Sequence, residues 1–336
     1  MEAEKKDNFD SGRFVISLDF ELFWGVRDKR TIESYGSNIL GVQKAIPAML
    51  RLFDEFGVKA TFSTVGFLFA KNKDILRQYI PPVLPEYSSK VLSPYTDLEK
   101  IGYDEKDDPY HFGYSLLRQV IDNGNHEVGT HTFSHYYCLE PGQNKESFLH
   151  DLAAAKKIAE QEGVKVRSLV FPRNQFNESY LTACKGSGID SFRGNPESWL
   201  YEPRNKNDES LFRRSLRFID TYINITGHHC HTKKYISSFP IINVAASRFL
   251  RPYSKKLAFL DPLRLRRIKK AMQHAAKQKL LFHLWWHPHN FGSNLDQNLS
   301  FLRKILVQFR ELNLKYGFQS KTMSGISDEL LKKEYA

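Results

Sequence analysis

Cysteine is scarce in this sequence, which has 336 residues and only three cysteines. Cys138, Cys184 and Cys230 lie far apart, and none belongs to a Cys-x-x-Cys pair. This small and odd number argues against a disulfide framework and favours a reducing compartment. A chain of this length can bury a core that is large enough to be stable without disulfides.

Long apolar runs are also missing, and no run approaches the roughly 18 residues of a membrane-spanning helix. The first residues, 1–13 (MEAEKKDNFDSGR), are charged and lack the apolar stretch of a secretory signal peptide. We therefore expect a soluble, cytoplasmic protein with no membrane span and with a flexible tail over residues 1–12. Peripheral contact with a membrane surface stays open, and so does the oligomeric state.

Acidic residues are outnumbered, with 38 Asp and Glu against 49 Lys and Arg, so the formal net charge is +11. The clearest basic cluster comprises Arg264, Arg266, Arg267, Lys269 and Lys270. Nucleic acid, an anionic membrane face and lipid-linked sugar phosphates are three partners that such an excess could serve. Because no nucleic-acid-binding motif accompanies the charge, we interpret the cluster as the solvated face of a helix and expect no nucleic-acid partner.

Strand-like and helix-like segments alternate along the chain. Residues 14–20 (FVISLDF) are apolar and β-prone, residues 39–56 have helical apolar spacing, and residues 59–65 form a second strand pattern. A strand, a helix and a strand in this order predict a parallel pair. The same alternation predicts helices at 114–121, 145–162, 178–185 and 295–316, and strands at 127–131, 167–171, 189–193, 280–286 and 318–320.

This rhythm favours a parallel α/β fold, and about seven or eight strands favour a barrel. Two segments, 81–111 and 194–262, break the alternation and are rich in aromatic residues. We expect both to be insertions at the rim of one domain that covers residues 13–336, because barrels carry their specificity in such loops.

The most specific local signal is the pair His131 and His135. Two histidines four residues apart can face one metal ion. They follow the predicted strand 127–131, and the C-terminal ends of strands are where barrel enzymes place their chemistry. Two unrelated polar residues in a loop would have the same spacing, so the interpretation depends on a third ligand.

Asp19 and Glu21 offer that ligand at the end of the first predicted strand. Residues two apart on a strand point to the same side, and two adjacent carboxylates are costly unless a cation or a proton separates them. Two histidines and one carboxylate leave positions on a metal open for water and substrate. The spare carboxylate could then act as a general base. The alternative is a strand end in solvent, and the two histidines decide against it.

Histidines also end the late strand 280–286. We interpret His287 as a general acid that protonates a leaving amine, and His283 as a buried, hydrogen-bonded core residue. His289 should lie outside the line of the reaction and matter less.

Three further features complete the candidates. Arg173 follows the predicted strand 167–171 and could pair with Asp19 and hold it ionised, although a surface salt bridge is the alternative. His126 is expected to orient a neighbouring ligand from the second coordination sphere. The run 228–231 (HHCH) matches no standard metal spacing, so we interpret it as a loop.

Together these motifs resemble the polysaccharide deacetylases with NodB homology (carbohydrate esterase family 4) from residue 17 to about residue 323. Residues 17–21 (SLDFE) resemble the first motif of that family, and residues 126–135 (HEVGTHTFSH) resemble the second motif, His-Ser/Thr-x-x-His. Residues 171–173 and 287–288 stand where the third and last motifs fall. The Asp-x-Glu pair departs from the common Asp-Asp and resembles an Asp-x-Asp branch that includes allantoinases.

The resemblance implies a distorted (β/α)7 barrel of the NodB-homology type. It also implies a hydrolase of carbon–nitrogen bonds that removes an acetyl group, mainly N-acetyl, from a sugar or polysaccharide precursor. The implied cofactor is one divalent metal ion, with zinc expected, held by Glu21, His131 and His135. Water bound to the metal attacks, Asp19 is the base and His287 the acid. Asp19 and Glu21 could exchange roles.

The implied substrate is a carbohydrate, and a lipid-linked form stays open. Arg173 joins the implied catalytic residues, and Trp24, Trp285 and Asn174 are expected to bind substrate. Aromatic residues of the two insertions should supply part of a sugar-facing rim, namely Tyr87, Tyr95, Tyr103, Trp199, Tyr201 and Phe239. The alternatives are an allantoinase-like hydrolase of a cyclic amide and a sugar-binding member without catalysis.

Overall fold

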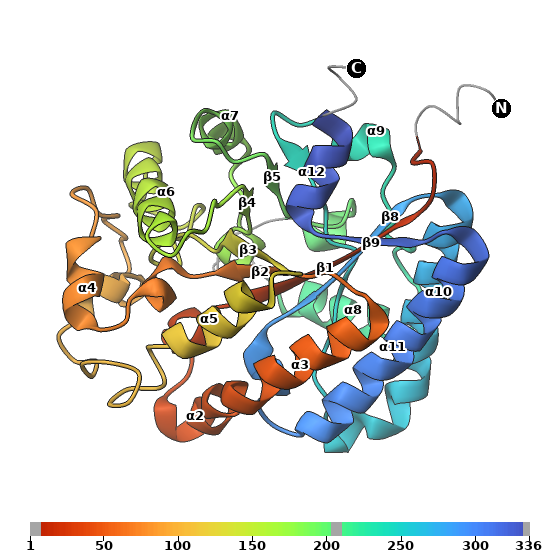
Figure 1. Ribbon diagram of the computed structural model, residues 1–336, viewed down its shortest axis with the longest axis horizontal. Coiled ribbons are helices and arrows are strands. Elements are labelled where there is room, and N and C mark those ends of the chain that lie inside the picture. Colours follow the sequence, from red (N-terminus) through yellow and green to blue (C-terminus); the bar gives the residue numbers. More distant parts are fainter. Residues whose placement is uncertain (1–7, 203–209, 332–336) are drawn as a thin grey trace.

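The computed structural model describes residues 8–202 and 210–331 (Figure 1). Residues 1–7 of the expected tail, and residues 203–209 and 332–336 of the expected domain, lie outside the described residues.

A parallel sheet forms the centre of the molecule, with strand β1 (Arg13–Phe20) in its middle (Figure 1). All eight residues of β1 are buried, as expected for a parallel strand that is covered on both faces. Its neighbours are β2 (Thr61–Thr64) and β8 (Leu281–Trp286), both parallel to it. The remaining strands are β3 (Glu127–Thr130), β4 (Ser168–Leu169), β5 (Ser191–Phe192), β6 (Ile242–Asn243), β7 (Arg248–Phe249) and β9 (Gln319–Lys321).

The sheet order is β6-β5-β4-β3-β2-β1-β8-β7, with β9 beside β1. One continuous segment supplies both ends of this path, because only residues 244–247 separate β6 from β7. On one side Val244 N–H donates to Phe192 O of β5 at 2.8 Å, and on the other Ser247 N–H donates to His283 O of β8 at 2.9 Å. The sheet therefore curls round, and with β6 and β7 counted as one strand and β9 left aside, seven strands form a distorted barrel. The predicted fold class is confirmed.

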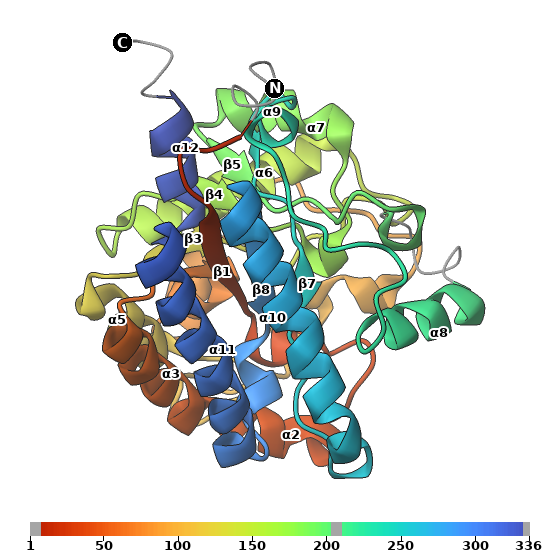
Figure 2. The same cartoon turned by 90° about the vertical axis from the view of Figure 1, so that its right-hand side faces the viewer.

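Helices pack around the sheet, and α3, α11 and α10 cover one side of it side by side (Figures 1 and 2). The helices are α2 (Ile32–Leu40), α3 (Val42–Phe56), α4 (Lys73–Gln78), α5 (Tyr114–Asn123), α6 (Lys145–Glu160), α7 (Glu178–Gly186), α8 (Leu211–Asp220), α9 (Lys233–Ile236), α10 (Asp261–Gln278), α11 (Leu295–Tyr316) and α12 (Met323–Leu331). None of the helices in the described part of the chain is long and apolar enough to cross a membrane.

The four predicted helices after residue 100 are confirmed, and α11 has the predicted bounds. The helix predicted at 39–56 is instead two helices that meet at Gly41. There a Cβ atom would lie 2.0 Å from Gly292 O, so only glycine fits at this position.

The prediction of an irregular insertion at 194–262 was wrong in part, because this segment contains α8, α9 and the closing strands β6 and β7. Each of these strands has only two residues, which is too short for a period of two to be visible in the sequence. The segment 81–111 is irregular as expected, apart from two short 3-10 turns.

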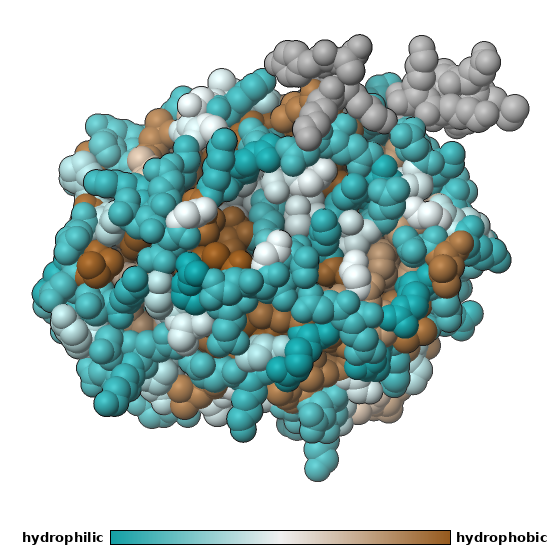
Figure 3. All heavy atoms as spheres, viewed as in Figure 1, coloured by the Kyte–Doolittle hydropathy of each residue, from teal (hydrophilic) through white to brown (hydrophobic). Residues whose placement is uncertain are grey.

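The basic cluster on α10 is not simply a solvated face. Arg264 and Arg267 are buried, and the guanidinium of Arg264 lies 4.0 Å from the ring centroid of Phe301. Arg267 donates to Asp220 at 3.5 Å. Long basic side chains can pack their stems in this way and still satisfy their charge. Elsewhere, hydrophilic side chains cover most of the face seen in Figure 3, and apolar ones are scattered among them.

Candidate metal centre and catalytic site

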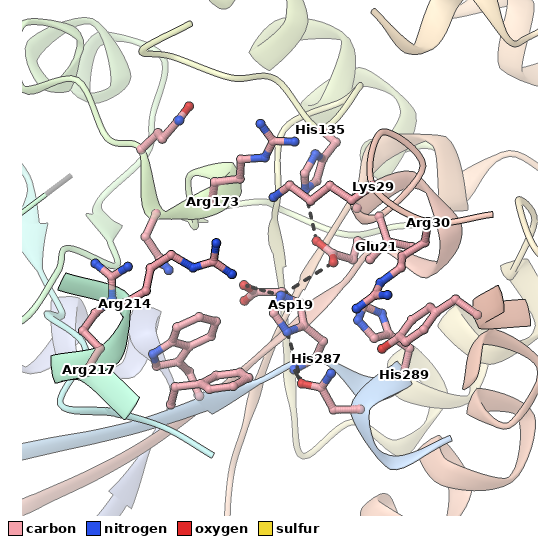
Figure 4. Close-up of a pocket in the computed structure, with 18 residues that line it drawn as sticks. Asp19, Glu21, Lys29, Arg30, His135, Arg173, Arg214, Arg217, His287 and His289 are labelled. Carbon is pink, nitrogen blue, oxygen red and sulfur yellow. Dashed lines mark hydrogen bonds and ion pairs between the residues drawn. The ribbon is translucent and has the colours of Figure 1, made fainter. Parts of the chain in front are cut away.

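The candidate site lies at the C-terminal ends of the barrel strands, where a cavity of about 800 Å³ opens (Figure 4). Asp19 and Glu21 reach it from the end of β1, and His287 reaches it from the end of β8. His135 enters from the loop that follows β3. The predicted catalytic residues from three distant parts of the sequence therefore share one cavity.

The three predicted metal ligands meet in the structure. Glu21 Oε2 lies 3.2 Å from His131 Nε2 and 3.1 Å from His135 Nε2. The ligand atoms of all three residues lie within 4.8 Å of one another, and all three side chains are buried. Glu21, His131 and His135 thus form a candidate metal site.

A buried carboxylate shapes the loop that presents His135. Asp151 of α6 accepts hydrogen bonds from the backbone N–H of Phe133 at 2.7 Å and of Ser134 at 3.1 Å. Burial raises the pKa of Asp151 to about 6, against the lowering effect of these hydrogen bonds. His135 itself has a φ of 58°, in the left-handed region that non-glycine residues rarely adopt. Asp151 thereby holds the strained turn that aims His135 at Glu21.

The donor atoms of the two rings indicate that the site fits a cation. His131 Nδ1 lies 2.8 Å from Val170 O, and it must donate because a carbonyl oxygen only accepts. In the neutral ring Nε2 then carries a lone pair, which faces Glu21 Oε2. Burial lowers the pKa of His135 to about 4, and its Nε2 faces the same carboxylate oxygen of Glu21. One carboxylate oxygen and two imidazole nitrogens that face one another form a donor set that suits zinc.

Asp19 has a different partner from the predicted one. Arg193, at the end of β5, donates to both carboxylate oxygens of Asp19, each at 2.7 Å. Burial alone would raise the pKa of Asp19, but the Arg193 guanidinium together with His131 and His287 outweighs this effect, so the pKa lies below its usual value. The predicted pairing of Asp19 with Arg173 was therefore wrong. Alternation of Ser191 and Arg193 along the predicted strand 189–193 was the available signal.

A buried hydrogen-bonded chain extends behind this ion pair. Arg193 Nη1 donates to Ser17 Oγ at 2.9 Å, and Ser17 Oγ lies 2.8 Å from His283 Nε2. His283 Nδ1 lies 2.7 Å from Val244 O, so Nδ1 donates and Nε2 accepts from Ser17. Burial and the nearby Arg193 lower the pKa of His283 to about 3, so the ring is neutral. The interpretation of His283 as a core residue is confirmed.

Arg173 lines the cavity but pairs with Asp28, and it lies 3.7 Å from Glu140. Its guanidinium also lies 4.1 Å from the ring centroid of Tyr137. The turn that follows brings Asn174 Oδ1 to 2.9 Å from Arg193 Nη2. Asn174, predicted to bind substrate, lines the cavity and also supports the arginine that holds Asp19.

His287 lines the cavity, as predicted, but it does not lie across from Asp19. Its Nε2 is 3.7 Å from Asp19 Oδ2 and 3.6 Å from Glu21 Oε1, so the ring stands beside both carboxylates. Asn290 Oδ1 faces Nδ1 at 3.3 Å. His289, expected outside the site, lines the same cavity and stacks on His287 with ring centroids 4.9 Å apart. Burial lowers the pKa of His289 to about 3.

Two predicted residues lie away from the cavity. Trp24 is 1% exposed, and its Nε1 donates to His111 O at 2.8 Å beneath the turn that follows β1, so no surface is left for a substrate. His126 precedes β3 and accepts from Ala60 N–H at 3.2 Å, at the end of the strand opposite to the ligands. It therefore cannot serve as their second-sphere partner.

Trp285 lines the cavity as predicted, and Phe249 of β7 packs against it with ring centroids 4.7 Å apart. The expected aromatic rim is mostly elsewhere. Tyr87 is buried against Tyr136 and Tyr137 under its own loop. Of the six aromatic residues named for the rim, only Tyr201 lines this cavity or the smaller one beside it.

Comparisons with known proteins agree with this geometry. Residues 36–192 match the family model described as polysaccharide deacetylase. A protein from Mycobacterium smegmatis, described as a polysaccharide deacetylase, has a similar solved structure with a TM-score of 0.61 and 12% identity, covering 97% of this chain and 92% of that chain. The PuuE allantoinase has a TM-score of 0.52 and 10% identity, covering 96% and 91%. At such identities the likeness shows the fold alone. No curated protein sequence matches this chain significantly.

Proposed function

We propose, from the match of residues 36–192 to the polysaccharide deacetylase family model, that this chain is a metal-dependent hydrolase that removes an N-acetyl group from a sugar. His131 and His135 belong to the matched segment, whereas Asp19, Glu21 and His287 lie outside it. The proposal depends on one observation above all: the ligand set formed by Glu21 and the two histidines adjoins the ion pair of Asp19 and Arg193.

The ligand set divides the two carboxylates by role. Glu21 Oε2 faces the Nε2 atoms of His131 and His135, which suits a metal ligand. Both oxygens of Asp19 are held by Arg193, which keeps the carboxylate ionised and suits a base. A divalent ion held by Glu21, His131 and His135, which we expect to be zinc, would supply Lewis-acid polarisation and a more acidic water molecule.

Asp19 and His287 then divide the proton transfers. Asp19 accepts a proton from the water molecule that attacks the acetyl carbonyl carbon. The carbon–nitrogen bond breaks as His287 Nε2 gives a proton to the leaving nitrogen, so that acetic acid and a free amine are formed. Because Asp19 Oδ2 and His287 Nε2 are 3.7 Å apart, a small movement of the ring lets the proton pass from Asp19 back to His287. His287 can therefore act as the general acid from its position beside Asp19, as it could from the predicted position across from Asp19.

The direct test is acetate release by the purified protein from a panel of N-acetylated sugars, with O-acetylated sugars and a cyclic ureide as separate arms. We expect acetate from at least one N-acetylated sugar, and its loss after removal of metal by a chelator and recovery on addition of zinc. Hydrolysis of the ureide without acetate release would favour the allantoinase-like alternative and contradict the proposal.

A variant separates a live enzyme from a sugar-binding protein without catalysis. His287→Ala should bind sugar and metal but lower kcat by a factor of about 10² to 10⁴, the usual contribution of a general acid. His289→Ala is the matched control, because its ring supports His287 by stacking and lies on the same turn. Equal and small effects of the two substitutions would remove His287 from the reaction.

A further inference from the structure

We propose that the sugar substrate carries a phosphate group, which binds in the arginine-rich half of the cavity. The inference rests on the proposed function and names the class of its substrate. It starts from the charges around the site, where five cationic side chains line the main cavity: Lys29, Arg30, Arg173, Arg214 and Arg217. Figure 4 shows Lys29 and Arg214 directed toward the part of the cavity that holds Asp19 and Glu21, whereas the guanidinium of Arg173 lies nearer to His135.

A second cavity of about 300 Å³ continues the first on the arginine-rich side. The two cavities share Arg173, Asn174, Arg217, Phe249 and Trp285 as lining residues, so they are compartments of one space. Arg248 and Arg251 add two more guanidinium groups to the second compartment, and among the described residues that line it only Glu202 is acidic. The space beside the reaction site is therefore strongly cationic.

Arg248 is the most informative of these side chains because it is buried and only partly satisfied. Its side chain is 5% exposed, and Nη1 donates to Asp220 O at 3.1 Å and Oδ2 at 3.3 Å. Its Nε and Nη2 are buried and have no hydrogen-bond partner within the described part of the chain. Leaving such donors unpaired costs free energy, and an acceptor-rich ligand in the adjoining compartment would satisfy them.

Arg251 and Arg214 add charge that the described structure does not neutralise. Arg251 Nε donates to Thr221 Oγ1 at 3.0 Å, and burial, with repulsion by Arg217, lowers the pKa of Arg251. Neither Arg251 nor Arg214 forms an ion pair with a carboxylate of residues 8–202 or 210–331. Like charges gathered in a half-buried space repel one another, and a bound anion would remove that cost.

Phosphate fits this surrounding better than a neutral sugar chain does. Guanidinium groups approach from the loop after β4, from α8 and from the segment around β7, and planar forks match phosphate oxygens from several directions. Of the six aromatic residues expected to form a sugar-facing rim, only Tyr201 lines either compartment in the described structure, beside Tyr35, Phe249 and Trp285.

The test measures binding by calorimetry, which does not depend on turnover. The probes are N-acetylglucosamine 1-phosphate, N-acetylglucosamine and an N-acetylated uronic acid of similar size. Arg214→Gln and Arg251→Gln should each weaken binding of the sugar phosphate roughly 10- to 100-fold and leave the neutral sugar unchanged. Because Arg214 is exposed, we expect Arg214→Gln to fold normally, so its affinity for the sugar phosphate can be measured. Arg266→Gln, an exposed arginine of α10 outside both cavities, is the control and should change neither affinity.

Three results would overturn the inference. One is equal affinity for the phosphorylated and neutral sugars, and another is equal affinity for the uronic acid, which would replace phosphate by a carboxylate. The third is phosphate binding that Glu21→Gln abolishes and the arginine variants do not change, since the phosphate would then bind the metal. Phosphate-dependent binding without acetate release from the same sugar would instead contradict the proposed function and leave the anion site standing.

Discussion

The two sides of the cavity differ in how they are built. On one side, Glu21, His131 and His135 come from two short motifs, and their atoms meet within 4.8 Å in a buried, closely packed cluster. On the other side, arginines from several separate segments between residues 173 and 251 line a space that holds excess positive charge. The chemistry is therefore encoded locally and the recognition of substrate is assembled by the fold, so the two sides should respond differently to substitution.

The largest effect is expected on the ligand side. Glu21→Gln and His135→Ala each remove one of three ligands, so both variants should lose the metal and with it essentially all activity, while the fold persists. Elemental analysis of the purified variants, with circular dichroism as a check of folding, measures this. Full metal content in both variants would contradict the assignment of Glu21 and His135 as metal ligands.

Asp19→Asn should keep the metal and lower kcat by a factor of about 10² to 10⁴, because it removes a base and not a ligand. Metal content and kcat measured on one preparation test this. If Asp19→Asn released the metal and Glu21→Gln did not, the two carboxylates would have to exchange roles.

Arg193 and Arg173 pair with different carboxylates, those of Asp19 and Asp28, so substituting each arginine tests the two pairs separately. Arg193→Gln leaves the buried Asp19 carboxylate without its bidentate partner, and breaking such a buried pair costs about 3 to 5 kcal/mol. Arg173→Gln also leaves a buried carboxylate without its partner, that of Asp28, but it keeps the Asp19 pair intact. Both variants should lose stability in urea unfolding, and kcat should fall further in Arg193→Gln. A larger fall of kcat in Arg173→Gln would contradict the assignment of Arg193 as the residue that holds Asp19 ionised.

That comparison also shows what the sequence could reveal. The two-residue spacing of Asp19 and Glu21, and the four-residue spacing of the histidines, are local patterns that predicted three ligands and the fold. The choice between Arg173 and Arg193 depends on how the sheet curls, since both follow short strands. The alternation of Ser191 and Arg193 along the predicted strand 189–193 made Arg193 a candidate, but it does not say which of the two arginines reaches Asp19.

Other differences between the predicted and the observed positions have similar physical causes. His126 stands next to the second motif in sequence, but β3 separates it from His131 by a strand of four residues, roughly 13 Å long. Trp24 follows the first motif closely, but a 3-10 turn at Leu22–Gly25 folds it beneath the site. Strands β6 and β7 escaped prediction because two residues carry no periodicity, although they close the barrel.

The smallest expected effect is on acid stability, and it involves His231, a buried residue that lines neither compartment of the cavity. Burial lowers the pKa of His231 from 6.5 to about 4, so the folded protein holds this ring neutral while the unfolded chain binds a proton. The contribution of this neutral ring to the free energy of unfolding is complete above pH 6.5 and is lost as the pH falls through about 4. It amounts to roughly 3 kcal/mol at most.

The free energy of unfolding, measured between pH 7.5 and about pH 4.5, should therefore fall toward acid. His231→Gln should reduce this slope, and the exposed-surface substitution Lys234→Gln is its control. An unchanged slope in His231→Gln would show that the ring is not neutral in the folded protein.

The central claim is that Glu21, His131 and His135 hold one divalent ion beside the Asp19–Arg193 pair. The most direct test is anomalous diffraction at the zinc edge from a crystal of the unmodified protein soaked in zinc. The account predicts one strong peak bounded by Glu21 Oε2 and the Nε2 atoms of His131 and His135. A peak elsewhere, with these three side chains turned away from one another, would contradict it.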